Sequence, residues 1–235
     1  MLTEMYYFLH ILAMVTMLVD HIGIMFFPEY QIFRYIGRIA FPLYAYFLVS
    51  GYHHTRNKYK YFIRLLITAL ISEPFRDLMV FGFNNEATTY LSSQNVCYTL
   101  CTGFIAMVLS DRIYLSGVKH KKLCAFLIFL SFGVLSDLAG FSYEFIGIIL
   151  IYFHYIAEKD ESFKHAMAPC VFIFMNFLIY PTVEAVMYLT VILDVILLIF
   201  YKDEKIKVNK TFSKINQWFY PVHLVVLLTV QLCFI

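Results

Sequence analysis

Long apolar runs recur along almost the whole chain, and few charged side chains interrupt them. A transmembrane helix needs about 20 consecutive, mostly apolar residues. Runs near this length lie at 5–27, 33–52, 59–81, 94–116, 123–139, 143–157, 166–181, 185–201 and 215–234. The chain is 61% hydrophobic and only 14% charged, which is far from the composition of a soluble domain. The sequence therefore predicts an all-α fold, a polytopic membrane helix bundle of about nine transmembrane helices in a single domain over residues 1–235. The two spans within 123–157 are short, so one of them could be re-entrant or packed inside the bundle.

Lysine and arginine alternate between successive connections as an odd number of spans requires, because cytoplasmic loops collect these residues. They follow the second, fourth, sixth and eighth runs at Arg56, Lys58, Lys60, Arg64, Arg112, Lys119, Lys121, Lys122, Lys159, Lys164, Lys202, Lys205, Lys207, Lys210 and Lys214. The connections near Pro28, Asn84, Gly140 and Thr182 are nearly free of them. We therefore expect a multi-pass protein of the inner or plasma membrane, with its N-terminus inside and its C-terminus outside. The N-terminus lacks the basic start of a signal peptide, so we expect the first span to be retained.

Net charge and cysteine spacing exclude several partners. The formal net charge of +2 is accounted for by the loop bias, so no nucleic-acid partner is expected. The five cysteines form no Cys-x-x-Cys pair and fall in or beside the apolar runs. We interpret them as packing residues and expect no metal site.

Asp20 and His21 lie side by side deep in the first apolar run. A titratable pair at such a depth is costly and marks a candidate functional site. His10 precedes His21 by eleven residues, or about three helical turns, so the two histidines share a face roughly 16 Å apart. Two histidines on one face could line a single tunnel, although His10 could also be an ordinary hydrogen-bonded core histidine.

Arg34, Arg38 and Arg76 break the alternation of charge, because they lie where the loop bias predicts an outer position. Arginines near a helix end can extend to the membrane interface, but a polar site explains their clustering as well. Arg34 and Arg38 are one helical turn apart at the level of Asp20, and we predict an ion pair between Arg38 and Asp20. Gly37 permits close helix approach, while Pro42 frees a backbone carbonyl.

Further polar residues gather toward the predicted outer half. Glu73 and Asp77 share a face of the third helix, and Gln94 and Asn95 begin the fourth. We therefore predict a substrate-binding set in this half, made of Arg34, Arg76, Asp77, Gln94 and Asn95. In the last helix, His223 follows Tyr220 and Pro221. It could serve the site, or it could be a structural histidine bonded to a carbonyl that Pro221 frees.

Six runs, in order along nearly the whole chain, resemble the TraX family. They are Met-Leu-Val-Asp-His-Ile-Gly at 17–23, Arg-Tyr-Ile-Gly-Arg-Ile-Ala-Phe-Pro at 34–42, 51–57, 72–77, 94–100 and 219–224. The resemblance implies a role in acetylating the N-terminal amine of conjugative pilin, and a distant similarity to membrane acyltransferases that use cytoplasmic acetyl-CoA. In those relatives a basic residue, ten others and a histidine mark the first helix. Here His10 stands where lysine or arginine is usual, and His21 is the matching histidine.

Acyl transfer from a thioester to an amine needs a base for the attacking nitrogen and a donor for the oxyanion. His21 is the best candidate base, because a histidine titrates near neutral pH. Asp20 points about 100° away around the helix, so we expect Glu73 or Asp77 to orient His21. Arg38 could bind the oxyanion or an acceptor carboxylate, and His223 could shuttle protons or hold the thioester. The predicted catalytic set is His21, Asp20, Arg38, Glu73 and His223.

Acetyl-CoA is the expected acyl donor, and we predict that its contacts come from the inner side. The residues assigned to it are His10, His53, His54, Arg56 and Tyr220. The basic rim of Arg56, Lys58, Lys60, Lys119, Lys121 and Lys122 could receive coenzyme phosphates, although the loop bias alone also explains those charges.

The sequence leaves three functional readings open. The first is an acetyltransferase whose acceptor is a peptide or pilin-like N-terminus, a sugar hydroxyl or a small lipid-linked molecule. The second is a small proton-coupled transporter with a relay of Asp20, His21, Glu73, Asp77 and Asp194, although no internal repeat is visible. A scaffold for secretion or pilus assembly needs no buried charges and is the least favoured.

Overall fold

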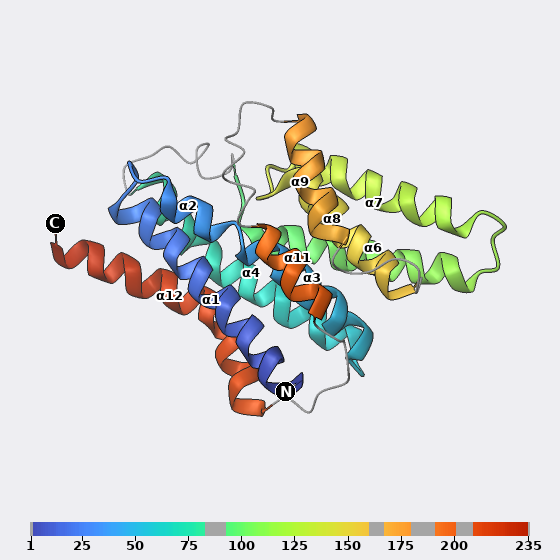
Figure 1. Cartoon of the computed structure of the whole chain (residues 1–235), viewed down its shortest axis with the longest axis horizontal. Coiled ribbons are helices and arrows are strands. Elements are labelled where there is room, and N and C mark those ends of the chain that lie inside the picture. Colours follow the sequence, from blue (N-terminus) through green and yellow to red (C-terminus); the bar gives the residue numbers. More distant parts are fainter. Residues whose placement is uncertain (1, 83–92, 160–166, 180–190, 201–208, 235) are drawn as a thin grey trace.

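A computed structural model describes residues 2–82, 93–159, 167–179, 191–200 and 209–234 (Figure 1). Throughout these residues the regular structure is helical, and the nearest approach to a sheet is one isolated bridge between Gln94 and Phe141. The helices are α1 (Leu2–Phe26), α2 (Ile32–Gly37), α3 (Ala40–His54), α4 (Lys58–Phe81), α6 (Val96–Leu115), α7 (Lys121–Leu138), α8 (Glu144–Lys159), α9 (Met167–Ile179), α11 (Val191–Phe200) and α12 (Lys210–Phe234). The predicted all-α fold is confirmed.

Each apolar run that the sequence predicts as a span contains described helix, with α2 and α3 sharing the second run. Three described segments are long and apolar enough to cross a bilayer, namely Glu4–Phe26, Ile32–His54 and Val96–Leu115. These helices and the composition agree with a membrane protein. The count of nine spans and the orientation stay predictions. The connections near Asn84 and Thr182 lie outside the described residues.

The second apolar run is not one continuous helix, because the chain turns at Arg38 and Ile39 between α2 and α3. Pro42 explains the break. It has no amide hydrogen for the carbonyl of Arg38, four residues earlier, and its ring would clash with that carbonyl in a regular helix. The backbone instead makes a tighter contact from Ile39 N to Ile36 O, at 3.2 Å.

Two buried clusters hold the helices together. The larger cluster joins α3, α6, α7, α8 and α9 through side chains such as Phe41, Phe104 and Tyr155. The second cluster joins α1, α3, α4, α6 and α12, with Met17 and Tyr220 among its members. Figure 1 shows α1 and α12 side by side, with α6 and α7 extending on the opposite flank. The clusters leave room between them for the cavity described below.

The starts of α1, α4 and α12 lie at the same end of the molecule as the end of α3. The amide of Asn209, just before α12, donates to the Tyr7 hydroxyl at 3.1 Å, and Gly51 of α3 packs against Tyr61 of α4. We call this end the α1-start end, and the other end, which holds Asp20 and Arg34, the α2 end.

A carboxylate that the sequence analysis did not single out ties several helices together at the end of α6. Asp111 accepts hydrogen bonds from the hydroxyls of Tyr52 and Tyr155, at 2.6 and 2.9 Å. Its oxygens also pair with Nζ of Lys58 and Lys159, at 2.8 and 2.9 Å. Lys58, a member of the predicted basic rim, is therefore paired within the protein, and its contact with a coenzyme phosphate stays a prediction.

Candidate functional site

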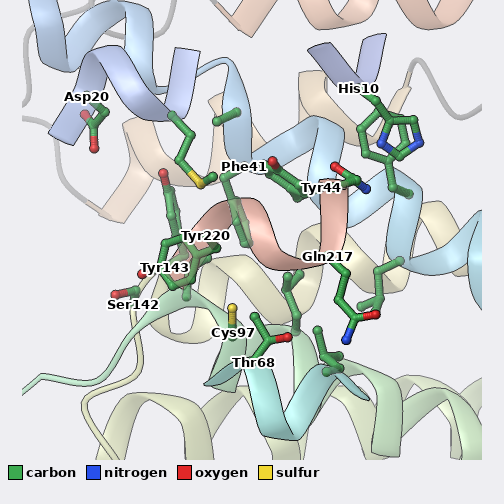
Figure 2. Close-up of a pocket in the computed structure, with 18 of the residues that line it drawn as sticks. His10, Asp20, Phe41, Tyr44, Thr68, Cys97, Ser142, Tyr143, Gln217 and Tyr220 are labelled. Carbon is green, nitrogen blue, oxygen red and sulfur yellow. The ribbon is translucent and has the colours of Figure 1, made fainter. Parts of the chain in front are cut away.

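A cavity of about 1110 Å³ runs between α1, α3, α4, α6 and α12. His10, His54 and Gln217 line it toward the α1-start end, while Asp20 and Tyr143 line it toward the α2 end. Figure 2 shows His10 and Asp20 at opposite sides of the view, with Tyr44 and Tyr220 between them. His21 lines the same cavity, so His10 and His21 share one cavity, as their spacing predicts.

Among the residues that the structure describes, His21 is bonded to a second histidine and to no carboxylate. Its Nδ1 atom lies 2.6 Å from Nε2 of His223, and the two rings are nearly parallel. Both side chains are buried, with exposed fractions of 8% and 5%. The sequence predicted that Glu73 or Asp77 of α4 orients His21. In the structure, His223 of α12 is the partner of His21 instead.

The hydrogen bonds of His223 determine where the protons of a neutral pair lie. Nδ1 of His223 is 2.7 Å from the carbonyl oxygen of Phe219, which can only accept. Nδ1 of His223 therefore carries the hydrogen, and its Nε2 is an acceptor. Nδ1 of His21 must then donate to that acceptor, which leaves the lone pair of His21 on Nε2. His223 is bonded to a backbone carbonyl, as the structural alternative predicts. That carbonyl belongs to Phe219, one helical turn before His223, and not to Gln217, whose carbonyl Pro221 frees.

Tyr220 lies in the same cavity wall, and its ring centroid is 6.0 Å from that of His21. His223 is not among the residues that line the cavity. Its ring contacts those of Phe219 and Tyr220. His21 thus belongs to the cavity wall, and His223 is the residue that holds its Nδ1 atom.

Asp20 forms its ion pair with Arg34, whose NH1 is 2.7 Å from Oδ2, whereas the sequence predicted Arg38 as the partner. The two arginines do lie one helical turn apart, since Arg38 N donates to Arg34 O at 3.2 Å, but Arg34 is the one whose guanidinium meets the carboxylate of Asp20. Gly37 is a point of close approach between α2 and α1: a Cβ atom there would lie 2.2 Å from Oδ1 of Asp20. The predicted close packing at Gly37 is confirmed.

Arg38 lines the cavity, and its guanidinium carbon lies 5.6 Å from the ring centroid of Tyr143. The ring of Tyr143 stacks on Phe41 with centroids 3.8 Å apart. Tyr143 and the next residue, Glu144, have positive φ angles of 63° and 44°, which is unusual for residues other than glycine. Such backbone strain costs on the order of 1 kcal/mol or more per residue and often occurs at functional sites.

The cavity also receives Arg76, whose NH1 and NH2 donate to the carbonyl and the hydroxyl of Ser93, at 2.6 and 2.7 Å. Asp77 is 3.2 Å from the same guanidinium. Asp77 itself is not among the residues that line the cavity. Arg76 therefore reaches the cavity from a position fixed by its neighbours.

Glu73, Gln94 and Asn95 hold the start of α6 and do not line the cavity. Asn95 caps α6 by accepting from the amide of Cys97 at 2.8 Å, and its side chain donates to the Ala69 carbonyl and to Glu73. Gln94 exchanges backbone hydrogen bonds with Gly140 and Ser142. Their predicted roles toward catalysis or substrate stay predictions, and their observed contacts are structural.

The residues predicted to contact the coenzyme lie in three places. His10, His54 and Tyr220 line the main cavity, and His10 stacks on Phe47 with ring centroids 3.7 Å apart. Arg56 lines a smaller neighbouring pocket. His53 lines neither and faces α8, where its ring stacks on Tyr155.

The carboxylates of the predicted proton relay have separate surroundings. Asp20 pairs with Arg34, Glu73 with Asn95, and Asp77 with Arg76. Asp194 is buried in α11, and neither of its oxygens has a hydrogen-bond partner within the described part of the chain. In the same ranges no three metal-ligating side chains gather in a way that could hold an ion.

Several cavity residues were missed by the sequence analysis. Asn216 and Gln217 line the cavity one helical turn before Tyr220, so the spacing within α12 could have revealed them. Ser142, Tyr143 and Glu144 reach it through a strained turn that no residue pattern indicates. Asp111, which lines neither pocket, was also missed, because in the sequence it resembles any other charge at a helix end.

These features define an all-helical protein with membrane-length apolar helices and a buried histidine pair on a large internal cavity. A family model described as TraX protein matches residues 7–231, and the chain belongs to the TraX family.

Two relatives accompany this match. The chain is 28% identical over 168 residues to a probable fimbrial assembly protein FimC, serogroup H1, of Dichelobacter nodosus, which covers 68% of this chain and 66% of that protein. It is 48% identical over 42 residues to the uncharacterized protein RP591 of Rickettsia prowazekii (strain Madrid E), which covers 18% of this chain and 16% of that protein. The chain thus matches less than two thirds of the length of either relative. No solved structure matches it significantly.

Proposed function

We propose that the chain is a multi-pass acetyltransferase of the inner or plasma membrane that moves an acetyl group from cytoplasmic acetyl-CoA to an acceptor amine. The observation that carries the proposal is the histidine pair, because it leaves the lone pair of Nε2 unshared on His21, a residue of the cavity wall. The TraX family and the fimbrial relative favour a pilin-like peptide N-terminus as the acceptor.

The reaction requires His21 to accept one proton and then return it. The acceptor amine attacks the thioester carbonyl carbon, and Nε2 of His21 takes the proton that the new C–N bond displaces. Nδ1 of His21 keeps its hydrogen bond to His223, which stabilises the positive ring. The C–S bond then breaks, and the thiolate of coenzyme A leaves with the proton that His21 returns. A base of this kind contributes roughly 10² to 10⁴ in rate.

The α2 end of the cavity offers donors for the oxygen of the tetrahedral intermediate and for the acceptor. Arg38 and Tyr143 carry such donors, and Arg34 is already engaged by Asp20. We assign Arg38 to the oxyanion or to an acceptor carboxylate. The donor enters from the α1-start end, which we expect to face the cytoplasm.

The test is acetyl transfer by the purified full chain in lipid nanodiscs. Radiolabelled acetyl-CoA is supplied with a pilin-like peptide that has a free N-terminal amine, and with the same peptide blocked at that amine. The proposal predicts label on the free peptide only, with one coenzyme A released per acetyl group. Absence of transfer to amine and hydroxyl acceptors, together with proton flux in liposomes that contain the protein, would favour the transporter instead.

A further inference from the structure

A second pocket opens beside the α1-start end of the main cavity, between the end of α3 and the start of α4. Its volume is about 490 Å³, and it is lined by Thr55, Arg56, Asn57, Tyr59, Lys60, Ile63 and Arg64. Thr55 and Arg64 line the main cavity as well. The two spaces therefore adjoin, and a single extended molecule can occupy both.

All charged residues of this pocket are cationic. Arg56, Lys60 and Arg64 are exposed, and none of the three forms an ion pair within the described part of the chain. Lys60 and Arg64 are one helical turn apart on the same face of α4. Three unpaired cations around one concavity favour a ligand that carries several negative charges.

The start of α4 adds to the positive electrostatic potential of this pocket. Asn57 caps the helix by accepting from the amide of Lys60 at 2.8 Å. The amides of Lys58 and Tyr59 lie in the first turn, where no carbonyl within the helix can accept from them. Backbone amides and the helix dipole both favour an anion at this position.

The neighbouring lysines differ in a way that separates this pocket from the general positive bias of the loops. Lys58 and Lys159 share the single carboxylate of Asp111, so each of them already has an ionic partner within the protein. Lys119, Lys121 and Lys122 lie near the turn between α6 and α7 and line neither pocket. The loop bias predicts all of these charges equally. In the described part of the chain, however, Arg56, Lys60 and Arg64 have no acidic partner and line one pocket.

We infer that Arg56, Lys60 and Arg64 bind the phosphate groups of the acyl donor, while its uncharged thioester arm passes Thr55 into the main cavity toward His21. The inference rests on the proposed function, because that function requires a coenzyme with its phosphates at one end and its thioester at the other. The distance suits an extended arm, because His10 and His21 alone are roughly 16 Å apart along α1. The headgroup of an anionic phospholipid has the same phosphate chemistry, so the test separates the two sources.

The experiment compares three proteins in nanodiscs made only of phosphatidylcholine. They are the wild type, the triple variant Arg56→Gln, Lys60→Gln, Arg64→Gln, and the control triple variant Lys119→Gln, Lys121→Gln, Lys122→Gln. Calorimetry measures the affinity of each for coenzyme A, 3′-dephospho-coenzyme A and pantetheine, and thermal unfolding confirms that each is folded.

We expect the pocket variant to lose affinity for coenzyme A by about 100-fold, because three exposed cations that contact the phosphates are removed together. Its affinity for pantetheine, which has no phosphate, should equal that of the wild type. The control variant should match the wild type for all three ligands. In turnover assays the pocket variant should show a raised KM for acetyl-CoA and an unchanged kcat.

Other outcomes have distinct meanings. Equal affinity of the wild type and the pocket variant for coenzyme A would overturn the inference and leave the proposed function standing, as would equal losses in the two triple variants. A wild type that binds no coenzyme A at all would overturn the proposed function itself. Stabilisation by phosphatidylglycerol that disappears in the pocket variant, without a change in coenzyme A affinity, would assign the pocket to lipid and overturn the inference.

Discussion

Nδ1 of His21 and Nε2 of His223 lie 2.6 Å apart, although 202 residues separate them along the chain. The pair joins the first and last described helices, and a backbone carbonyl at Phe219 fixes its polarity. A histidine thus takes the position in which a carboxylate often orients a catalytic histidine. The partner of His21 is therefore a neutral imidazole and not a carboxylate. The feature to test is the acceptor atom, Nε2 of His223.

Replacing His223 tests whether an acceptor is required behind His21. In His223→Gln the side-chain carbonyl can still accept from His21, whereas in His223→Leu nothing can. We expect His223→Leu to lower kcat for acetyl transfer by about 10²-fold with little change in KM for acetyl-CoA, and His223→Gln to recover much of the loss. Equal kcat values for the two variants, in proteins of equal thermal stability, would show that only packing matters at this position.

Gly37→Ala tests the close approach of α1 and α2. The new Cβ atom would lie 2.2 Å from Oδ1 of Asp20, so the helices must separate and the ion pair with Arg34 must weaken. We expect a loss of stability of about 1–3 kcal/mol, measured by unfolding in detergent. The double variant Asp20→Gly, Gly37→Ala removes the clashing side chain. A double-mutant cycle should show strong coupling between the two sites, and simple additivity would contradict this geometry.

Asn95 and Asn57 provide a matched comparison of two helix caps. Each caps its helix through a side-chain oxygen at 2.8 Å, but Asn95 is fully buried and also bonds Ala69 and Glu73, whereas Asn57 is exposed. Asn57→Ala should cost about 1 kcal/mol of stability. Asn95→Ala should cost about 2–4 kcal/mol, because buried polar groups lose their partners. The measurement is the unfolding midpoint of each variant, and a smaller effect at Asn95 would be incompatible with its observed contacts.

Asp111→Asn tests the contacts that link the ends of α3, α4, α6 and α8. The change removes the charge that compensates Lys58 and Lys159 and leaves an amide among two lysines and two tyrosine hydroxyls. We expect a fall in stability of about 2 kcal/mol or more, since partly buried charges lose their partner. Asp137→Asn, at an exposed position of α7, is the control and should be nearly neutral. Similar melting temperatures for both variants would refute the structural role of Asp111.

The sequence predicted what depends on local pattern. Apolar length located the helices, helical periodicity put His10 and His21 on one cavity, and the small side chain of Gly37 indicated close packing. Pairings between distant helices could not be predicted in the same way. The partner of His21 depends on how α1 and α12 are rotated against each other, which no single helix encodes.

Two further differences have similar physical causes. Arg34 replaces Arg38 beside Asp20 because the level at which α1 and α2 meet is set by their packing, and helical spacing alone does not distinguish two arginines one turn apart. Tyr143 enters the cavity through two residues with positive φ angles, a conformation that neither Tyr143 nor Glu144 favours by itself. Contacts to the start of α6 hold this turn in place, including those between Gln94 and Ser142.

In the proposed reaction, Nε2 of His21 is the base for acetyl transfer. The most direct measurement is the single-turnover rate of acetyl transfer by His21→Gln, compared with the wild type at saturating acetyl-CoA and a free-amine peptide. We expect a fall of about 10² to 10⁴ in this rate, with coenzyme A affinity close to that of the wild type. A folded His21→Gln variant that transfers acetyl groups at the wild-type rate would contradict it.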